Sequence, residues 1–216
     1  MSCIADTIIS LNNELPQAVK LVAVSKFKPV EDILEAHSAG QRAFGENRPQ
    51  ELAAKAAVLP QDIEWHFLGH LQTNKLKMVL PYATLIHSID STRLLEAVDK
   101  AAGASGKKIA CLLEVHISKD ESKQGFSPNE IMEISRHFED YPNIIFKGLM
   151  GMASLTDDMD QVRSEFRSLK ELSDTISAVV PGFNEISMGM SGDWQTAVEE
   201  GATIVRIGSR IFGSRN

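Results

Sequence analysis

The stretch LVAVSKFKP, from Leu21 to Pro29, places a lysine at the end of a short apolar run. Leu21 to Val24 are expected to form a buried strand, because short apolar runs of this kind are typical of parallel-sheet cores. Lys26 follows almost at once, although most lysines lie on solvated surfaces. A charged side chain in this place raises the question of what it binds.

Similar apolar runs recur along the chain, separated by amphipathic helical stretches. The expected strands cover residues 21–25, 42–46, 64–69, 84–90, 108–118, 145–152, 184–190 and 203–209. About 26 residues separate successive strands, which is the size of a parallel β-strand with its helical crossover. Eight such units predict a single α/β domain over residues 1–216, a (β/α)8 TIM-type barrel. A doubly wound open sheet is the alternative.

Helix signals fall between these strands. Ser127 and Glu130 have the spacing of a capping box, and a long amphipathic helix is expected at about 158–180. Ser191 is expected to cap a helix that stops at Gly201. An apolar stripe near the start predicts an extra N-terminal helix that docks on the barrel, through Ile4, Ile8, Leu11 and Leu15.

The composition excludes several classes of protein. Of the 216 residues, 43% are apolar and 24% are charged, which is ordinary for a globular protein, and the net charge of −7 argues against nucleic-acid binding. The first residues lack the basic segment of a signal peptide, and no apolar run reaches membrane-spanning length. We therefore expect a cytoplasmic protein. Cys3 and Cys111 are expected to be free thiols.

The carboxyl ends of the expected strands carry polar residues, and these ends form the functional face of a barrel. Lys26 and Arg206 stand out because each is attached directly to an apolar strand. A lysine at a loop is more often simply solvated. The functional alternative is a Schiff-base lysine, whose amine must be neutral and whose pKa must therefore be lowered by burial or a nearby cation.

Two glycine–serine turns follow the last two strands, SMGMSGDW at 187–194 and RIGS at 206–209. Glycines let backbone N–H groups approach an anion, and loops after strands 7 and 8 form the usual phosphate site of barrels. Each turn alone is a weak signal. Together with Lys26 they predict a ligand that carries both a phosphate and an aldehyde, and pyridoxal phosphate is the obvious one.

Other motifs have simpler interpretations. GASGKK (103–108) lacks the spacing of a P-loop and precedes a strand, so a turn is expected. His66 and His70 are four residues apart, but Gly69 and the strand setting do not suit a helical zinc site. We expect His66 and His87 to be core or rim histidines. Four methionines could line a ligand or simply pack at the top of the barrel, namely Met150, Met152, Met188 and Met190.

The sequence resembles the pyridoxal phosphate homeostasis proteins, the YggS/PROSC family. The matching motifs span residues 21 to 213 and include LVAVSKFKP, FGENRPQE, EWHFLGHLQTNK, ISKDESKQGF, SMGMSGDW and ATIVRIGSRIFG. The resemblance implies a single barrel like the N-terminal domain of alanine racemase. Two departures are Phe27, where the family commonly has Thr, and Gly192 before Asp193.

The resemblance also implies roles for individual residues. Lys26 would carry the cofactor as an internal aldimine, and Arg206 would face the pyridine nitrogen. The phosphate would be held by Ser191, Gly208 and Ser209, and the ring would be lined by Asn47, Met188 and Met190.

Two functions follow from this site, a non-catalytic carrier of pyridoxal phosphate and an amino-acid racemase. A guanidinium only donates hydrogen bonds, so Arg206 would leave the ring nitrogen unprotonated and weaken carbanion stabilisation. Racemisation also needs a second base, and Tyr82 and Tyr141 are both expected away from the barrel mouth. We therefore expect a carrier that delivers cofactor to apo-enzymes and affects amino-acid and keto-acid balance indirectly. We also expect a monomer without catalytic residues or a metal. A cofactor-free Schiff-base lyase is a third interpretation, disfavoured by the two phosphate-type turns.

Overall fold

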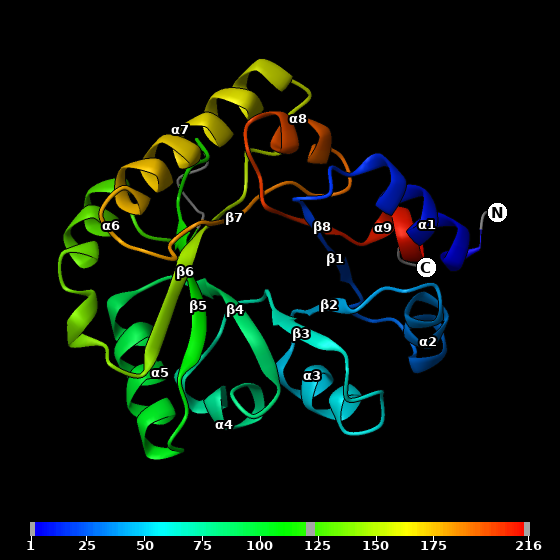
Figure 1. The fold of residues 1–216 in the computed structure, drawn as a ribbon, viewed down its shortest axis with the longest axis horizontal. Helices are drawn as coiled ribbons and strands as arrows, with labels where there is room; N and C mark the ends of the chain where they lie inside the picture. The colour runs from blue at the N-terminus through cyan, green and yellow to red at the C-terminus, as the bar shows by residue number, and fades with distance from the viewer. Residues whose placement is uncertain (1–2, 120–123, 214–216) are drawn as a thin grey trace.

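A closed ring of parallel strands organises the chain (Figure 1). The computed structural model describes residues 3–119 and 124–213. Its strands pair in sequence order, and β8 pairs with β1 to close the barrel. They are β1 (Lys20–Val24), β2 (Ala43–Glu46), β3 (Glu64–Phe67), β4 (Ala83–Ile89), β5 (Ile109–Val115), β6 (Ile144–Gly151), β7 (Glu185–Ser187) and β8 (Ile204–Ile207). The predicted barrel class is confirmed, and the open sheet is excluded.

Helices surround the ring of strands in Figure 1. They are α1 (Ile4–Glu14), α2 (Val30–Ser38), α3 (Pro49–Ala56), α4 (Leu76–Val79), α5 (Thr92–Ala104), α6 (Pro128–Ser135), α7 (Met159–Ser177), α8 (Trp194–Glu199) and α9 (Ser209–Phe212), with 3-10 turns η1 (Thr73–Lys75) and η2 (Phe138–Asp140). The capping box at Ser127 and Glu130 is present. In the described ranges, none of the helices combines the length and apolarity that crossing a bilayer would require.

The extra N-terminal helix is confirmed as α1, which lies beside the C-terminal helix α9 (Figure 1). Ile8 and Leu11 are fully buried on its inner face. Arg210 of α9 donates to Glu14 of α1 over 2.7 Å, and this contact ties the first helix to the end of β8. The segment that follows β8 is thereby held from outside the barrel.

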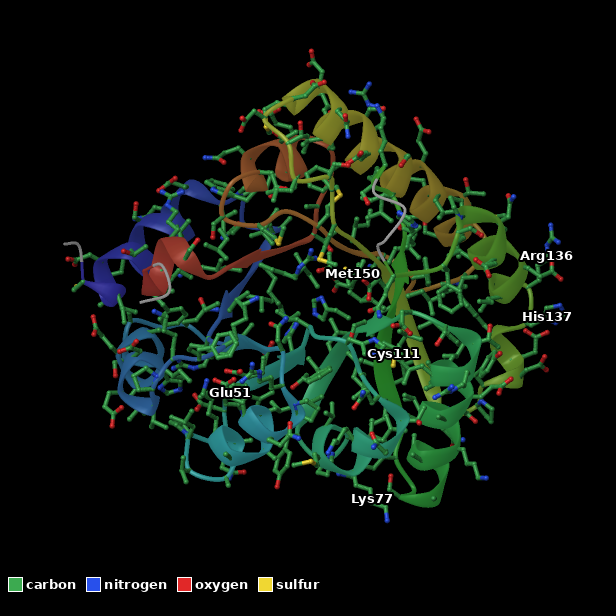
Figure 2. All side chains as sticks on the ribbon, turned by 180° about the vertical axis from the view of Figure 1, so that it is seen from behind. Glu51, Lys77, Cys111, Arg136, His137 and Met150 are labelled. Atoms are coloured by element: carbon green, nitrogen blue, oxygen red, sulfur yellow. The ribbon has the colours of Figure 1, made fainter. Side chains whose placement is uncertain are left out.

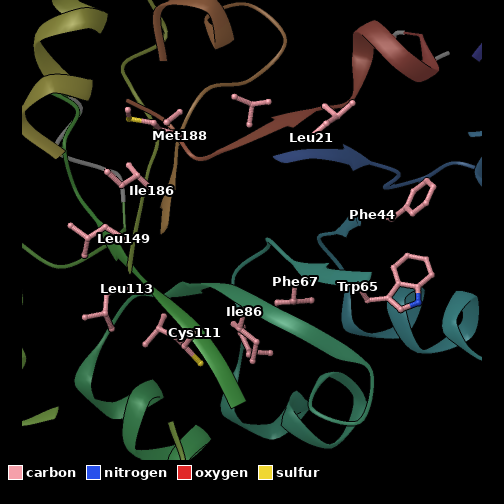
Figure 3. Packing of buried hydrophobic residues seen from close by; sticks show 14 of the residues in the cluster. Leu21, Phe44, Trp65, Phe67, Ile86, Cys111, Leu113, Leu149, Ile186 and Met188 are labelled. Carbon is pink, nitrogen blue, oxygen red and sulfur yellow. The ribbon is translucent and has the colours of Figure 1, made fainter. Parts of the chain in front are cut away.

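Strand alternation divides the core into two clusters. The larger lies between the strands and the helices, and Figure 3 shows its members placed around the ring, Leu21, Phe44, Phe67 and Met188 among them. The smaller cluster fills the barrel interior and includes Val22, Leu112, Met150 and Ile204. Figure 2 accordingly shows Met150 near the middle of the ring. Because neighbouring residues of a strand face opposite sides, a shift of one position moves a side chain from one cluster to the other.

Several predicted strands are longer than the observed ones. The segment expected at 184–190 is a strand only over Glu185–Ser187. Gly189 has a φ of 88°, outside the β region, so the chain turns before it reaches Ser191. The strand expected at 108–118 also ends early, at Val115. Part of the motif at 117–126 lies outside the described residues.

Candidate functional site

A cavity of ≈ 340 Å³ opens among the segments that follow the strands. Its lining contains almost every residue predicted for the cofactor, which are Lys26, Asn47, Met190, Ser191, Arg206, Gly208 and Ser209. They come from segments following β1, β2 and β7, and from β8 with the turn after it. The barrel therefore gathers in one place residues that are up to 183 positions apart in the chain.

The lining also contains residues that were not assigned to it from the sequence, namely Val24, Leu68, His87, Met150, Met152 and Gly192. Met150 and Met152 had been left open between a ligand wall and packing, and both lie at the cavity. His87 was expected in the core or at the rim, and it is fully buried as well as part of the lining.

Met188 is the exception among the predicted residues. It is fully buried in the outer cluster, between the strands and the helices (Figure 3), and it does not line the cavity. The alternation along β7 explains this, because Ser187 faces the barrel interior and its neighbour therefore faces out. Met190, beyond the turn at Gly189, returns to the cavity.

A larger cavity of ≈ 760 Å³ lies beside the loops after β3 and β4. It contains none of the residues predicted for the cofactor. Its wall contains Arg93 and also His70 and Asp90, whose side chains are 2.9 Å apart and hydrogen-bonded to each other. The smaller cavity brings a lysine and an arginine together with both glycine–serine turns, so it is the better candidate for a ligand with a phosphate and an aldehyde.

The turn that carries Lys26 is fixed by a buried charge cluster. Lys55 of α3 donates from Nζ to the Ser25 carbonyl oxygen at 2.8 Å, to Glu46 Oε1 at 2.8 Å and to Glu51 Oε1 at 2.7 Å. The Phe27 N–H donates to the same Glu51 oxygen at 2.6 Å. The side chains of Lys55 and Glu51 thus hold the backbone on both sides of Lys26.

Phe27 itself adopts a left-handed conformation with a φ of 64°. This conformation is costly for an aromatic residue, and the hydrogen bond of its N–H to Glu51 compensates for part of that cost. The guanidinium of Arg48 lies 4.5 Å from the centre of the Phe27 ring, a cation–π distance. Lys26 is therefore presented by a defined turn rather than by a flexible loop.

Arg206 forms the charged floor of the cavity. It is 6% exposed, and its guanidinium donates from Nη1 to Ser187 Oγ at 2.6 Å and from Nη2 to the Gly151 carbonyl oxygen at 3.0 Å. Burial lowers the pKa of Arg206 to about 10, so the group remains a cation at neutral pH. A guanidinium has five N–H donors, and these two contacts leave donors for a ligand.

The two glycine–serine turns lie against each other. The Gly208 N–H donates to Ser191 Oγ at 3.4 Å, which joins the segment after β7 to the segment after β8. Ser191 was expected to cap α8, and this expectation is wrong. The N-cap is Asp193, whose carboxylate accepts from the Met190 N–H. The helix starts two residues later than expected, and the Ser191 hydroxyl accepts from the Gly208 N–H instead.

One buried polar atom of the lining lacks a protein partner. Asn47 Oδ1 is buried without a hydrogen bond in the described part of the protein. Buried acceptors are nearly always satisfied, so a ligand with a donor group is expected to pair with it. The backbone at Asn47 is held close to Gly69, where a Cβ atom would come within 2.1 Å of the Asn47 carbonyl oxygen. A ligand donor beside Asn47 would therefore meet an acceptor in a fixed place.

Neither Tyr82 nor Tyr141 is among the lining residues of this cavity. Tyr141 packs edge-on against Phe146 on β6, and Tyr82 is exposed just before β4. Cys111 is buried and free, and no group of metal-binding side chains was found among the described residues.

Known proteins are similar to this chain in sequence and in fold. The family model described as "Alanine racemase, N-terminal domain" matches residues 2–216. A curated relative from Vibrio alginolyticus, named "Pyridoxal phosphate homeostasis protein", is 40% identical over 206 residues, which is 93% of this chain and 88% of that protein. The chain belongs to the pyridoxal phosphate homeostasis protein family.

Solved structures agree with this assignment. PipY of Synechococcus elongatus, solved with pyridoxal phosphate bound, is 38% identical and has a TM-score of 0.90, covering 97% of this chain and 100% of that one. Alanine racemase from E. faecalis is 18% identical with a TM-score of 0.77, covering 98% of this chain but 58% of that one. The second likeness concerns the fold alone.

Proposed function

We propose that the protein binds pyridoxal phosphate in this cavity and serves cofactor homeostasis rather than catalysis. The observation that carries the proposal is the meeting of Lys26, Arg206 and both glycine–serine turns in one cavity of ≈ 340 Å³. The residues fit the group, because they supply an amine for its aldehyde, hydroxyls and backbone N–H groups for its phosphate, and an N–H donor for its ring nitrogen. Pyridoxal phosphate bound in PipY, a family relative, supports the same choice.

Each residue has a distinct task in this proposal. Lys26 is the covalent anchor and forms the internal aldimine, and Arg206 donates a hydrogen bond to the pyridine nitrogen. Ser191, Gly208 and Ser209 hold the phosphate, while Asn47 and Met190 lie along the ring. Met150 and Met152 complete the wall. When bound, the cofactor supplies an electrophilic carbon and a ring that can delocalise negative charge.

Two features favour a carrier over a racemase. A guanidinium donates and does not accept, so the ring nitrogen beside Arg206 stays unprotonated and the ring is a weaker electron sink. Among the described lining residues, Lys26 and His87 are the side chains that could exchange a proton on a carbon atom. Both ring nitrogens of His87 are engaged, with His66 and with Ser187, so His87 is not a free base.

The carrier proposal includes the fate of the cofactor. Held by a reversible covalent bond at the open end of the barrel, it could be passed to apo forms of pyridoxal-phosphate enzymes. Loss of the protein would then disturb amino-acid and keto-acid balance indirectly, through enzymes that lack cofactor.

A direct experiment tests the site. The purified protein is loaded with pyridoxal phosphate, reduced with borohydride and digested, and the labelled peptide is identified by mass spectrometry. We expect a visible absorption band before reduction and a label on Lys26. The absence of binding, or a label that lies on another lysine, would contradict the proposal.

A further inference from the structure

The interior of the barrel contains a layer of polar side chains beneath the cavity. His66 of β3, His87 of β4, Ser187 of β7 and Arg206 of β8 are all buried, and alternation places them on the inner side of their strands. Branched apolar residues usually fill such layers. Burying polar side chains destabilises the fold unless they form hydrogen bonds with one another. The hydrogen bonds of this layer therefore decide whether it can be tolerated.

The four side chains form one continuous chain of contacts. Arg206 Nη1 lies 2.6 Å from Ser187 Oγ, and Ser187 Oγ lies 2.9 Å from His87 Nδ1. His87 Nε2 then lies 2.8 Å from His66 Nδ1. The chain runs from the floor of the cavity into the barrel.

The donor and acceptor properties of the four side chains determine which atom donates in each of these hydrogen bonds. The guanidinium can only donate, so Ser187 Oγ accepts from Arg206. The buried hydroxyl also has one proton of its own, and His87 Nδ1 is the acceptor within reach. His87 must then carry its proton on Nε2, from which it donates to His66 Nδ1. The reverse direction would leave the buried serine proton without an acceptor.

Both histidines are suited to this neutral arrangement. Burial, together with the charge of Lys20, lowers the pKa of His66 to about 4. Burial, together with the charges of His66 and Arg206, lowers the pKa of His87 well below its usual value. At neutral pH each ring therefore has one donor and one acceptor, as a directed chain requires.

We propose that Ser187, His87 and His66 are positioning residues that hold Arg206 in one orientation toward the cavity. Ser187 fixes Nη1 and selects the tautomer of His87, His87 orients the Ser187 hydroxyl, and His66 accepts from His87 Nε2 and so holds the ring in place. Gly151 fixes the other terminal nitrogen through its carbonyl oxygen. The guanidinium is thus held at two points while its remaining donors face the ligand. In its use of the ring nitrogen, this inference rests on the proposed function.

The first test uses cofactor-free protein and therefore does not depend on the ligand. Histidine is labelled with ¹⁵N, and long-range ¹H–¹⁵N spectra report which ring nitrogens carry protons. Between about pH 5.5 and 8, we expect His87 and His66 both to be neutral and protonated on Nε2. A proton on His87 Nδ1 in the wild-type protein would reverse the chain and overturn the proposal.

Substitution of Ser187 should release the chain. In Ser187→Ala, the His87 tautomer loses the donor that selects it, so its ¹⁵N signals should shift or broaden. Ser187→Cys keeps the buried volume but bonds weakly, and it should act in the same direction if the alanine variant does not fold. Ser173→Ala is the matched control, because Ser173 is equally buried but lies on the outer helix α7. Unchanged His87 signals in both Ser187 variants would overturn the proposal.

The second test couples Ser187 to the ring nitrogen. Pyridoxal phosphate is compared with the analogue in which the ring nitrogen is replaced by C–H. One hydrogen bond to a charged donor corresponds to roughly a tenfold preference for the true cofactor. We expect this preference in the wild type and in Ser173→Ala, and less than about threefold in Ser187→Ala. Ser191→Ala should weaken both ligands and keep the preference.

The outcomes separate this inference from the proposed function. A wild-type preference that survives Ser187→Ala would contradict the positioning role alone. Equal binding of the two ligands by the wild type would contradict the placement of the pyridine ring at Arg206. It would also contradict the proposed role of the hydrogen-bonded side chains in cofactor binding. If pyridoxal phosphate does not bind, the proposed function is contradicted. The histidine tautomers in the cofactor-free protein would still decide whether the hydrogen-bonded series from Arg206 to His66 exists.

Discussion

Lys55 Nζ lies 2.8 Å from the carbonyl oxygen of Ser25, the residue that precedes Lys26. The Lys55 side chain on α3 therefore contacts the turn that carries Lys26, the proposed cofactor anchor. It also forms ion pairs with the carboxylates of Glu46 and Glu51. Burial raises the pKa of one of them, Glu46, and the hydrogen bond from Lys55 opposes this rise. The cluster is therefore a costly arrangement that shapes the turn.

Removal of the buried ammonium should destabilise the protein. Lys55→Met leaves Glu46 and Glu51 without their cation and should lower the free energy of unfolding by on the order of 3 kcal/mol. The matched control is Lys20→Met, which breaks an ion pair with Glu64 that is about half exposed and should cost less than about 1 kcal/mol. Urea denaturation measures both. Equal losses in the two variants would show that the buried cluster has no special role.

Replacement of Lys26 should abolish covalent retention of the cofactor without unfolding the barrel. The side chain lies at the cavity, outside both core clusters, so Lys26→Ala removes little packing. We expect loss of the visible band and a midpoint of urea denaturation close to that of the wild type. Lys77→Ala, on α4 at the outer surface in Figure 2, should keep the band. A covalent band in Lys26→Ala would place the anchor elsewhere.

The two serine hydroxyls should contribute to phosphate binding. A hydrogen bond to a charged group contributes about 1.5–3 kcal/mol, so Ser191→Ala or Ser209→Ala should weaken retention of pyridoxal phosphate at least roughly tenfold. Pyridoxal without the phosphate should bind far more weakly than either variant binds the full cofactor. Equilibrium dialysis compares the ligands. If pyridoxal and its phosphate bind equally well, the phosphate site is wrongly assigned.

The carrier and the racemase predict different behaviour toward alanine. We expect the loaded protein to exchange the α-proton of alanine in heavy water far more slowly than a racemase does, and to form no D-alanine at a useful rate. NMR and chiral chromatography measure the two. Arg206→Glu would permit ring protonation, but it also places a carboxylate in the cavity, so weaker cofactor binding should accompany any spectral change. Inversion at enzyme-like rates in the wild type would refute the carrier.

Glu114 should make the cofactor-free protein less stable as the pH rises. Burial, and to a lesser degree the charge of Asp90, raises the pKa of Glu114 to about 7, whereas Arg206 lowers it. Between about pH 4.5 and 7 the folded protein therefore keeps a proton that the unfolded chain has lost, so stability falls across this interval. The pKa rise corresponds to roughly 3 kcal/mol.

Glu114→Gln provides the measurement. It cannot ionise, so its stability relative to the wild type should be lowest near pH 5 and should grow by up to about 3 kcal/mol near pH 8. His66 acts with the opposite sign, since its lowered pKa makes stability fall as the pH drops from about 6.5 toward 4. A constant difference between variant and wild type across this range would contradict the raised pKa of Glu114.

The fold could be predicted because its signal is repeated and local. Each unit consists of a short apolar strand and a helical stretch, and eight such units at this spacing favour a closed parallel barrel over an open sheet. Lys26 and Arg206 were found because each follows or lies within an apolar strand. These features depend on neighbouring residues, which a sequence displays directly.

Other parts of the site depend on contacts between distant residues. Met188 and Ser187 differ by one position, and only the register of β7 decides which of them faces the barrel interior. The Ser191 hydroxyl could pair with the start of α8 or with Gly208, and the outcome depends on where the helix begins and on the approach of the turn after β8. His66 and His87 could have been placed inside by strand alternation, but the contact of His87 on β4 with Ser187 on β7 crosses the barrel and required the closed ring.

The hydrogen bond from Gly208 to Ser191 has a kinetic consequence for loading. The two turns are already joined before a ligand enters, so an incoming anion exchanges one partner for another and does not have to order a loose segment. Little conformational entropy is then lost at the moment of association. Loading should therefore show a rapid encounter step, with no slow ordering step before it, followed by the slower bond formation at Lys26.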